Sequence, residues 1–249
     1  MTITSHHNQK LKEIRKLRQR RRWRERSGRF VAEGEDLLAA ADGAGWEAVE
    51  RYSAAGSGLE GIEVEADLLA SASGLGSGTR ALAVYEERWA PAPLGPLCVY
   101  LHGVHDPGNV GTILRSAEAF GAGSVVLGPG SADPFSPKAV RASMGAVFTV
   151  PLVHGGDLQA LPGVKIALVP GEGAALDEVW QSASTPRKEI ATVREATVLV
   201  GAERDGLPAE IIAGADHVAH IPTQSHSLNA AMAATVALYE LRNRMAAHE

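Results

Sequence analysis

The second half of the chain alternates short apolar runs with amphipathic segments. Nearly continuous apolar runs are typical of strands buried on both faces of a parallel sheet. Such runs predict strands at LCVYLHGV (97–104), SVVLGPG (124–130), FTVPLV (148–153), KIALVP (165–170), ATVLVGA (196–202) and HVAHIP (217–222). Helical patterns lie between and after them, at 110–122, 137–147 and 227–245. The alternation predicts an α/β fold with a mostly parallel sheet covered by helices on both sides.

The first half predicts a smaller α/β unit. Leu11, Ile14 and Leu17 recur at helical spacing, and Trp23 extends the stripe, so we expect one helix over residues 8–26 that ends at Ser27-Gly28. A strand at 29–32, a helix at 35–41 and a last strand near 81–87 follow. Three prolines in RWAPAPLGP (88–96) mark a linker. We therefore expect domains at 1–90 and 97–249, joined by residues 91–96.

Composition narrows the class of protein. The 249 residues are 45% apolar, which suffices for a buried core. The single cysteine, Cys98, excludes an internal disulfide and a cysteine-clustered zinc site, and the nine histidines are scattered, so we expect no metal. No apolar run approaches a membrane span, and the first residues hold no stretch of signal-peptide type. We expect a cytoplasmic protein without membrane contact.

Charge is concentrated at one place. The formal net charge is −5, yet KLKEIRKLRQRRRWRER (10–26) holds ten Lys or Arg against two Glu. A basic segment in an otherwise acidic chain favours a nucleic-acid partner, although a solvated helix face or a free tail is the plain alternative. The candidate RNA-binding residues are Lys10, Lys12, Arg15, Arg18, Arg20, Arg21, Arg22 and Arg24.

Three predicted strand ends carry unusual polar residues. The first strand runs into DPGN (106–109), and Arg115 follows within the next helix, where it either has a partner or extends past the core face into solvent. The second ends in GAERDGLP (201–208), where Gly201 permits either close ligand approach or a plain turn. The third ends in IPTQSHSLN (221–229), where Ser227 is a natural N-cap and Asn229 is less expected in a first turn.

Together and in this order, the three loops resemble the motifs of the SpoU (TrmH-like) branch of the SPOUT RNA methyltransferases. The resemblance covers residues 97–245. Matching positions are Asn109 and Arg115 in motif 1, Gly201 and Glu203 in motif 2, and Ile221, Ser227, Leu228 and Asn229 in motif 3. The stretch KLRQRRRWRERSGRFVAEGEDLL (16–38) is similar to the family's substrate-binding extension, a small α/β domain like certain ribosomal proteins.

The resemblance implies a deep trefoil knot, a homodimer formed through the C-terminal domain, S-adenosylmethionine as methyl donor and a ribose 2′-hydroxyl of RNA as acceptor. It favours ribosomal RNA of the large subunit, 23S. Arg115 is implied on the acceptor side, as phosphate anchor or as base, and an anchor suits guanidinium chemistry better. Further implied catalytic residues are Asn109, Glu203, Ser227 and Asn229, and the implied cofactor-binding residues are Gly201, Ile221 and Leu228.

Other functions stay open at this point. Only residues 223–226 separate Ile221-Pro222 from Ser227, fewer than family members usually have, which favours a non-catalytic RNA-binding or ribosome-assembly protein of the same fold. Cofactor binding discriminates these two. A base-methylating SPOUT enzyme acting on guanine is a further alternative, which product analysis discriminates. A DNA-binding regulator is less favoured because the basic segment has no helix-turn-helix neighbour.

Overall fold

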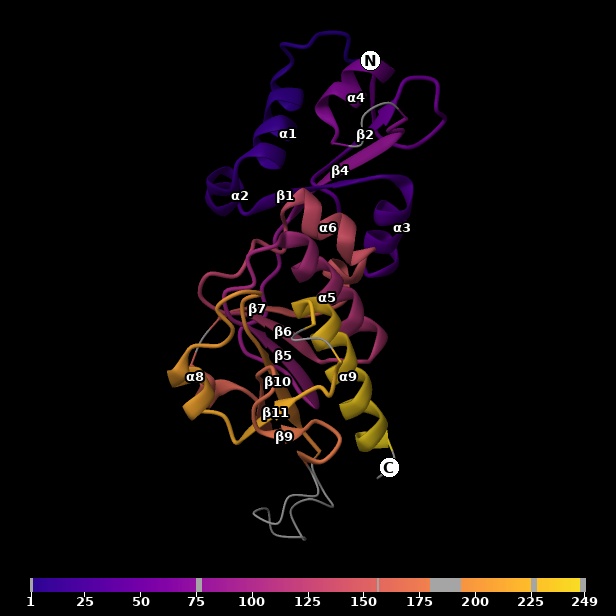
Figure 1. Cartoon of the computed structure of the whole chain (residues 1–249). Coiled ribbons are helices and arrows are strands. Elements are labelled where there is room, and N and C mark those ends of the chain that lie inside the picture. Colours follow the sequence, from indigo (N-terminus) through magenta and orange to yellow (C-terminus); the bar gives the residue numbers. More distant parts are fainter. Residues whose placement is uncertain (1, 75–77, 156, 180–193, 225–227, 247–249) are drawn as a thin grey trace. The chain divides into compact units, whose positions relative to one another are not determined.

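The chain folds into two compact units in a computed structural model, which describes residues 2–74, 78–155, 157–179, 194–224 and 228–246 (Figure 1). One unit comprises Met1–Arg88 and Asp133–Thr149, and we call it the N-terminal unit. The other comprises Trp89–Ala132 and Val150–Glu249, and we call it the C-terminal unit. The N-terminal unit therefore includes a segment from the second half of the sequence.

The N-terminal unit is built on a four-stranded sheet of order β1-β4-β2-β3. β4 runs antiparallel to both β1 and β2, whereas β2 and β3 are parallel. The strands are β1 (Arg29–Glu33), β2 (Glu50–Ala54), β3 (Ile62–Val64) and β4 (Ala81–Glu86). The helices are α1 (Gln9–Gln19), α2 (Arg21–Ser27), α3 (Glu35–Gly43), α4 (Ala66–Ala72), α6 (Pro137–Ser143) and the 3₁₀ turn η1 (Ala146–Phe148).

An aromatic cluster explains why residues 133–149 belong to this unit. The rings of Phe30, Trp46 and Tyr85 pack against Phe135 and Phe148 with neighbouring centroids 4.7 to 6.3 Å apart. The indole Nε1 of Trp46 also donates to the carbonyl oxygen of Phe148 at 2.8 Å. Because η1 holds Phe148 here, β7 starts only at Leu152, and the expected strand over 148–153 is shorter than predicted.

The basic segment forms two helices, and the prediction of one helix over 8–26 is wrong in this respect. Arg20 is extended (φ −127°, ψ 105°) and ends α1, and α2 begins directly after it. Leu11, Ile14 and Leu17 are fully buried, as their spacing predicts. The break turns α2 so that the side chain of Arg24 reaches back to the end of α1.

Two arginines of this segment, Arg18 and Arg24, form ion pairs inside the N-terminal unit and thus have a structural role. The guanidinium of Arg24 is 2.6 Å from Asp133 Oδ2 and donates to the carbonyl oxygen of Leu17 at 2.5 Å. Arg18 pairs with the buried carboxylate of Glu33 at 2.5 Å and donates to the carbonyl oxygen of Ala72. Paired and hydrogen-bonded in this way, buried guanidinium groups are tolerated, and removing one partner leaves an uncompensated charge.

Replacing Arg24 by alanine therefore leaves the carboxylate of Asp133 without its guanidinium partner. It also leaves the carbonyl oxygen of Leu17 without the donor that it accepts from. We expect Arg24→Ala to lower the free energy of unfolding by about 3–5 kcal/mol in a urea titration. The matched control is Arg21→Ala, which breaks an exposed pair with Glu25 and costs only about 0.3–0.5 kcal/mol. Equal unfolding midpoints for the two variants would show that the Arg24 pair stabilises nothing.

The C-terminal unit is a seven-stranded sheet of order β7-β6-β5-β10-β8-β11-β9, and every neighbouring pair is parallel. The predicted parallel sheet is confirmed. The strands are β5 (Leu97–Leu101), β6 (Ser124–Leu127), β7 (Leu152–His154), β8 (Val164–Leu168), β9 (Ala174–Ala175), β10 (Ala196–Val200) and β11 (His217–His220). β5 and β10 are buried along their whole length, as continuous apolar runs predict.

Helices cover both faces of this sheet (Figure 1). On one face α9 packs against β5 and β10, and α5 packs against α9 and β6, whereas α8 lies on the other face. The helices are α5 (Pro107–Ala119), α8 (Ala209–Ala213), α9 (Ala230–Ala246) and the 3₁₀ turn η2 (Leu158–Ala160). β9 has only two residues and is not among the strands that the apolar runs predict. Within the described residues, no helix is both long and apolar enough to span a membrane.

Candidate functional site

The polar residues of the three strand-end loops meet at the carboxyl edge of the parallel sheet. The loop after β5 turns into α5, which Asp106 caps by accepting from the backbone N–H of Gly108 at 2.5 Å, with Pro107 in the first turn. The helix thus starts earlier than the apolar pattern predicts. The loop after β10 closes as a tight turn in which Ala202 and Gly206 exchange two backbone hydrogen bonds of 3.1 Å.

A relay of amide groups joins one residue from each loop. Asn229 donates from Nδ2 to Asn109 Oδ1 at 3.1 Å, and Asn109 donates from Nδ2 to Glu203 Oε1 at 2.5 Å. Asn109 lies 94 positions before Glu203 and 120 positions before Asn229 along the chain. The structure therefore brings together three of the predicted catalytic residues, one from each motif.

Asn229 also begins the last helix. Its Oδ1 accepts from the backbone N–H of Ala231 at 2.9 Å and of Met232 at 3.4 Å, and α9 starts at Ala230. The expectation that Asn229 lies inside the first turn is thus corrected, because Asn229 itself performs the capping. Ser227, the predicted cap and catalytic residue, lies outside the described residues.

Arg115 lies on the exposed side of α5, six residues after Asn109. Within the described residues its guanidinium makes no hydrogen bond or ion pair, including none with Glu203. Of the two readings of Arg115, the structure therefore favours the one in which the side chain extends into solvent. An exposed guanidinium keeps all its donors available for an anion.

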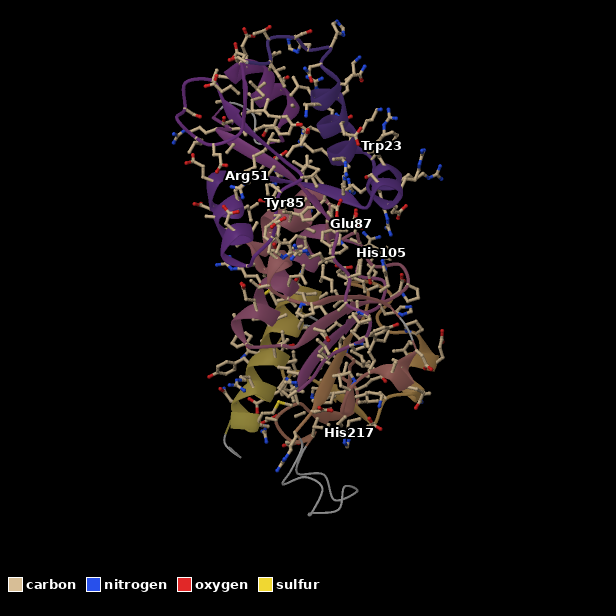
Figure 2. All side chains as sticks on the ribbon, turned by 180° about the vertical axis from the view of Figure 1, so that it is seen from behind. Trp23, Arg51, Tyr85, Glu87, His105 and His217 are labelled. Carbon is tan, nitrogen blue, oxygen red and sulfur yellow. The ribbon has the colours of Figure 1, made fainter. Side chains whose placement is uncertain are left out.

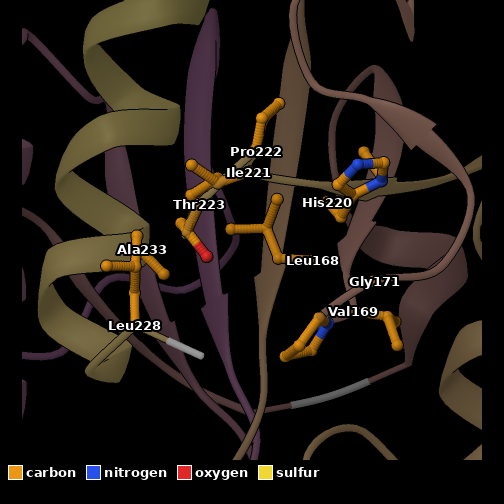
Figure 3. Close-up of a pocket in the computed structure, with 11 residues that line it drawn as sticks. Leu168, Val169, Gly171, His220, Ile221, Pro222, Thr223, Leu228 and Ala233 are labelled. Atoms are coloured by element: carbon orange, nitrogen blue, oxygen red, sulfur yellow. The ribbon is translucent and has the colours of Figure 1, made fainter. Parts of the chain in front are cut away.

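A pocket of about 400 Å³ lies between the ends of β8 and β11 and the start of α9 (Figure 3). Two predicted cofactor-binding residues, Ile221 and Leu228, line it. The end of β8 and the residues after it form the opposite wall, with Leu168, Val169 and Gly171. This wall is not among the predicted binding residues. KIALVP carries no polar signal, and only the strand order places β8 beside β11.

Gly201 does not line the pocket. A Cβ atom at this position would collide with the backbone of Gly206 and Leu207, so the tight turn after β10 itself requires a glycine. The plain-turn reading of Gly201 therefore suffices to explain the residue. The predicted role of Gly201 in cofactor binding stays a prediction.

The pocket suits an adenosine-type ligand by its chemistry. Its walls are mostly apolar, and its volume lies within the range of small-molecule sites. Within the described residues, the backbone of Ile221 makes no hydrogen bond to other backbone groups, which leaves a donor and an acceptor at the pocket edge. His220 Nδ1 is 3.3 Å from the carbonyl oxygen of Glu172, which holds its ring against the loop between β8 and β9. The described residues include no group of side chains able to hold a metal ion.

The predicted RNA-binding residues fall into two groups. Arg18 and Arg24 are engaged in the interior of the N-terminal unit, as described above, and Lys10 pairs with Glu50. Arg20, Arg21 and Arg22 are exposed, and Lys12 and Arg15 are half-buried. The exposed group lies at the start of α2.

The dual role of Asn229 predicts different effects for two substitutions. We expect Asn229→Ala to lower the free energy of unfolding by about 0.5–2 kcal/mol, because the cap of α9 is lost. Asn229→Asp keeps the Oδ1 acceptor but removes the donor to Asn109, so its stability should stay within about 0.5 kcal/mol of wild type. Urea titrations compare the two. An alanine variant as stable as wild type would contradict the cap.

Comparisons with known proteins agree with this geometry. Residues 96–239 match the SpoU rRNA Methylase family, and residues 8–83 match the MRM3-like substrate binding domain. The family match covers more than half of the chain, so the chain belongs to the SpoU rRNA methylase family. The resemblances found in the two halves of the sequence are both confirmed.

Individual relatives cover the chain to different extents. The Bacillus subtilis 23S rRNA (guanosine(2553)-2′-O)-methyltransferase RlmP is 36% identical over 141 residues, 56% of this chain and 55% of that protein. The uncharacterized tRNA/rRNA methyltransferase slr1673 of Synechocystis is 31% identical over 98% of this chain and 94% of its own length. A crystal structure of AdoMet-bound rRNA methyltransferase from Sinorhizobium meliloti superimposes with a TM-score of 0.83 at 28% identity, over 98% of both chains.

Proposed function

We propose that the chain transfers a methyl group from S-adenosylmethionine to a ribose 2′-hydroxyl of ribosomal RNA, with 23S rRNA favoured. The observation that carries the proposal is the Asn229–Asn109–Glu203 relay, which joins the three motif loops beside the apolar pocket. The names of RlmP and of the Sinorhizobium meliloti structure support the acceptor and the donor.

The pocket at β8 and β11 is the proposed cofactor site. The backbone of Ile221 and Leu228 would hold the cofactor, and the apolar side chains of Leu168 and Val169 would cover the flat adenine ring. When bound, S-adenosylmethionine supplies a methyl group that its sulfonium sulfur already activates. The protein then has to position the acceptor and keep the site geometry fixed.

Arg115 is the proposed anchor for the RNA phosphate next to the acceptor ribose. Its guanidinium has no carboxylate partner among the described residues and can bind a phosphate bidentately. A role as base would require a very large fall of a pKa that normally lies above ~12. Asn109 and Asn229, held by the relay, would orient the ribose, and Glu203 fixes the amide of Asn109.

RNA affinity is assigned to the N-terminal unit, in line with the proposed division into a substrate domain (1–90) and a methyltransferase domain (97–249). Phosphate contacts from exposed cations supply affinity without sequence choice. We propose Lys12, Arg15, Arg20, Arg21 and Arg22 for these contacts, and a structural role for Arg18 and Arg24. A cytoplasmic location and a trefoil knot in the C-terminal unit stay predictions.

The proposal is tested by measuring cofactor binding and methyl transfer on the same variant. We expect Arg115→Ala to bind S-adenosylmethionine as wild type does in calorimetric titration. Transfer of labelled methyl groups to 23S rRNA should fall on the order of 100-fold, because the acceptor is no longer anchored. Nucleoside analysis should find the label on ribose. Arg242→Ala, which removes an exposed arginine from α9, is the matched control and should retain full activity.

Three outcomes would contradict parts of the proposal. Absence of cofactor binding by the wild-type protein, with and without RNA, would favour the non-catalytic RNA-binding alternative. Label on the guanine base would favour a base-methylating enzyme. Unchanged methyl transfer by Arg115→Ala would remove Arg115 from the site while leaving the reaction intact.

We further propose that the chain forms a homodimer through α9. Met232, Val236 and Tyr239 recur at helical spacing on this helix and are 40 to 58% exposed. They make up half of the exposed large apolar side chains that the structure describes. Phe120 of α5 packs edge-on against Tyr239 with ring centroids 5.9 Å apart, which extends the face. A contiguous apolar face of this kind is typical of an interface, and a second copy presents the same face.

A charge placed on this face should separate the subunits. We expect Tyr239→Glu to sediment as a monomer at concentrations where the wild-type protein sediments as a dimer, because an interface core tolerates no unpaired carboxylate. Leu94→Glu introduces the same charge at another exposed apolar residue and should leave the dimer intact. A monomeric wild-type protein, or equal behaviour of both variants, would contradict an interface at α9.

A further inference from the structure

The outer surface of α2 carries a shallow groove of about 490 Å³, in which only Arg20, Arg21 and Arg22 have a role assigned above, as phosphate contacts. Four arginines and a tryptophan line it, namely Arg20, Arg21, Arg22, Trp23 and Arg26. Figure 2 shows Trp23 among nitrogen-tipped side chains of the N-terminal unit. All of these arginines are exposed, and Trp23 is half-buried.

Arg20, Arg21 and Arg22 lie at the start of α2, where their positive charges oppose the stability of the helix. Cations at the first residues of a helix interact unfavourably with the positive end of its dipole, and α2 has no acidic residue in its first turn to offset them. Within the described residues only Arg21 forms an ion pair, with the exposed carboxylate of Glu25. Arg20 and Arg22 thus repel one another without a carboxylate partner among the described residues, whereas Arg26 lies over the Trp23 ring. Such local conflicts are expected where a surface serves binding rather than folding.

Trp23 provides a fixed aromatic ring in this groove. Its indole Nε1 donates to Glu13 Oε1 at 2.7 Å, which ties the ring to α1. Lys16 Nζ lies over the ring at 4.2 Å from its centroid, and the guanidinium carbon of Arg26 lies at 5.3 Å. A half-buried indole with cations beside it combines an aromatic face with positive charge, which is the combination that binds unpaired nucleotides.

We propose that this groove binds an unpaired nucleotide of the RNA substrate, with its base stacked on Trp23 and the flanking phosphates held by Arg20, Arg22 and Arg26. The proposal deepens the proposed function and rests on it for the identity of the polyanion. Sequence-tolerant binding of single strands commonly combines aromatic stacking with a cationic groove. A base inside a duplex is covered by its neighbours and cannot reach Trp23, so the site selects loops and bulges over helices.

The test compares a mixed-sequence 12-nucleotide RNA strand with the same strand in a duplex, by fluorescence anisotropy with the full-length protein. We expect Trp23→Ala to weaken single-strand binding roughly 5- to 100-fold and duplex binding far less. Trp23→Phe keeps an aromatic face and should stay within about threefold of wild type. The double variant Arg22→Gln/Arg26→Gln should lower the slope of log affinity against log salt by about 1.4, at ~0.7 per lost phosphate contact. Trp23→Ala should leave that slope unchanged.

Arg80→Ala is the charge control, because it removes an exposed arginine of the same unit outside the groove. If circular dichroism shows that Trp23→Ala is unfolded, the salt slope of the arginine variant and the single-strand affinity of Trp23→Phe test the proposal instead. Equal losses for single strand and duplex, or no loss in either, would overturn the stacking site. Cofactor binding and methyl transfer are measured separately from RNA binding. A protein without methyltransferase activity can still prefer the single strand, and an active enzyme can still lack this preference.

Discussion

The parallel alignment of the C-terminal sheet is the constraint on which the site depends. Because β5, β10, β8 and β11 all run in one direction, their carboxyl ends open at one edge. The loop after each strand then reaches the same space, although the loops lie far apart in the sequence. The strand order also separates two tasks along this edge. β5 and β10 deliver Asn109 and Glu203 to the relay, whereas β8 and β11 form the walls of the pocket.

Much of this arrangement can be predicted from the sequence, and the failures have physical causes. Continuous apolar runs identify β5 and β10 because both strands are buried on both faces. The relay residues are found because the three strand-end loops, taken together and in order, resemble the SpoU motifs. The wall from β8 is missed because backbone and apolar groups bind without a polar signal, and because strand order is a tertiary property. Gly201 allows two explanations from the sequence, a ligand contact and a tight turn, and the structure shows that the turn alone already requires a glycine.

The arginines of the basic segment illustrate why residue type alone does not assign a role. Arg24 and Arg20 lie four residues apart, yet the break between α1 and α2 directs Arg24 to Asp133 and leaves Arg20 in solvent. The helix break was not predictable from the apolar stripe, since Leu11, Ile14 and Leu17 lie entirely before it. A buried, fully bonded guanidinium fixes the position of α2. The exposed cations of the segment have no such structural role, so their side chains can bind a phosphate.

Asn229 couples the folding of α9 to the geometry of the site. Its Oδ1 is held by the first N–H groups of the helix, so the orientation of the whole amide is set, and Nδ2 must point away toward Asn109. Asn109 then has its Oδ1 occupied and can only donate from Nδ2, which it does to Glu203. The direction of every hydrogen bond in the relay is therefore dictated by the helix cap at one end and the carboxylate at the other. Since a carboxylate accepts but does not donate when ionised, neither amide can flip without leaving an unpaired group. Asn109 and Asn229 thereby keep one orientation before any ligand binds, which is the preorganisation that positioning an acceptor ribose requires.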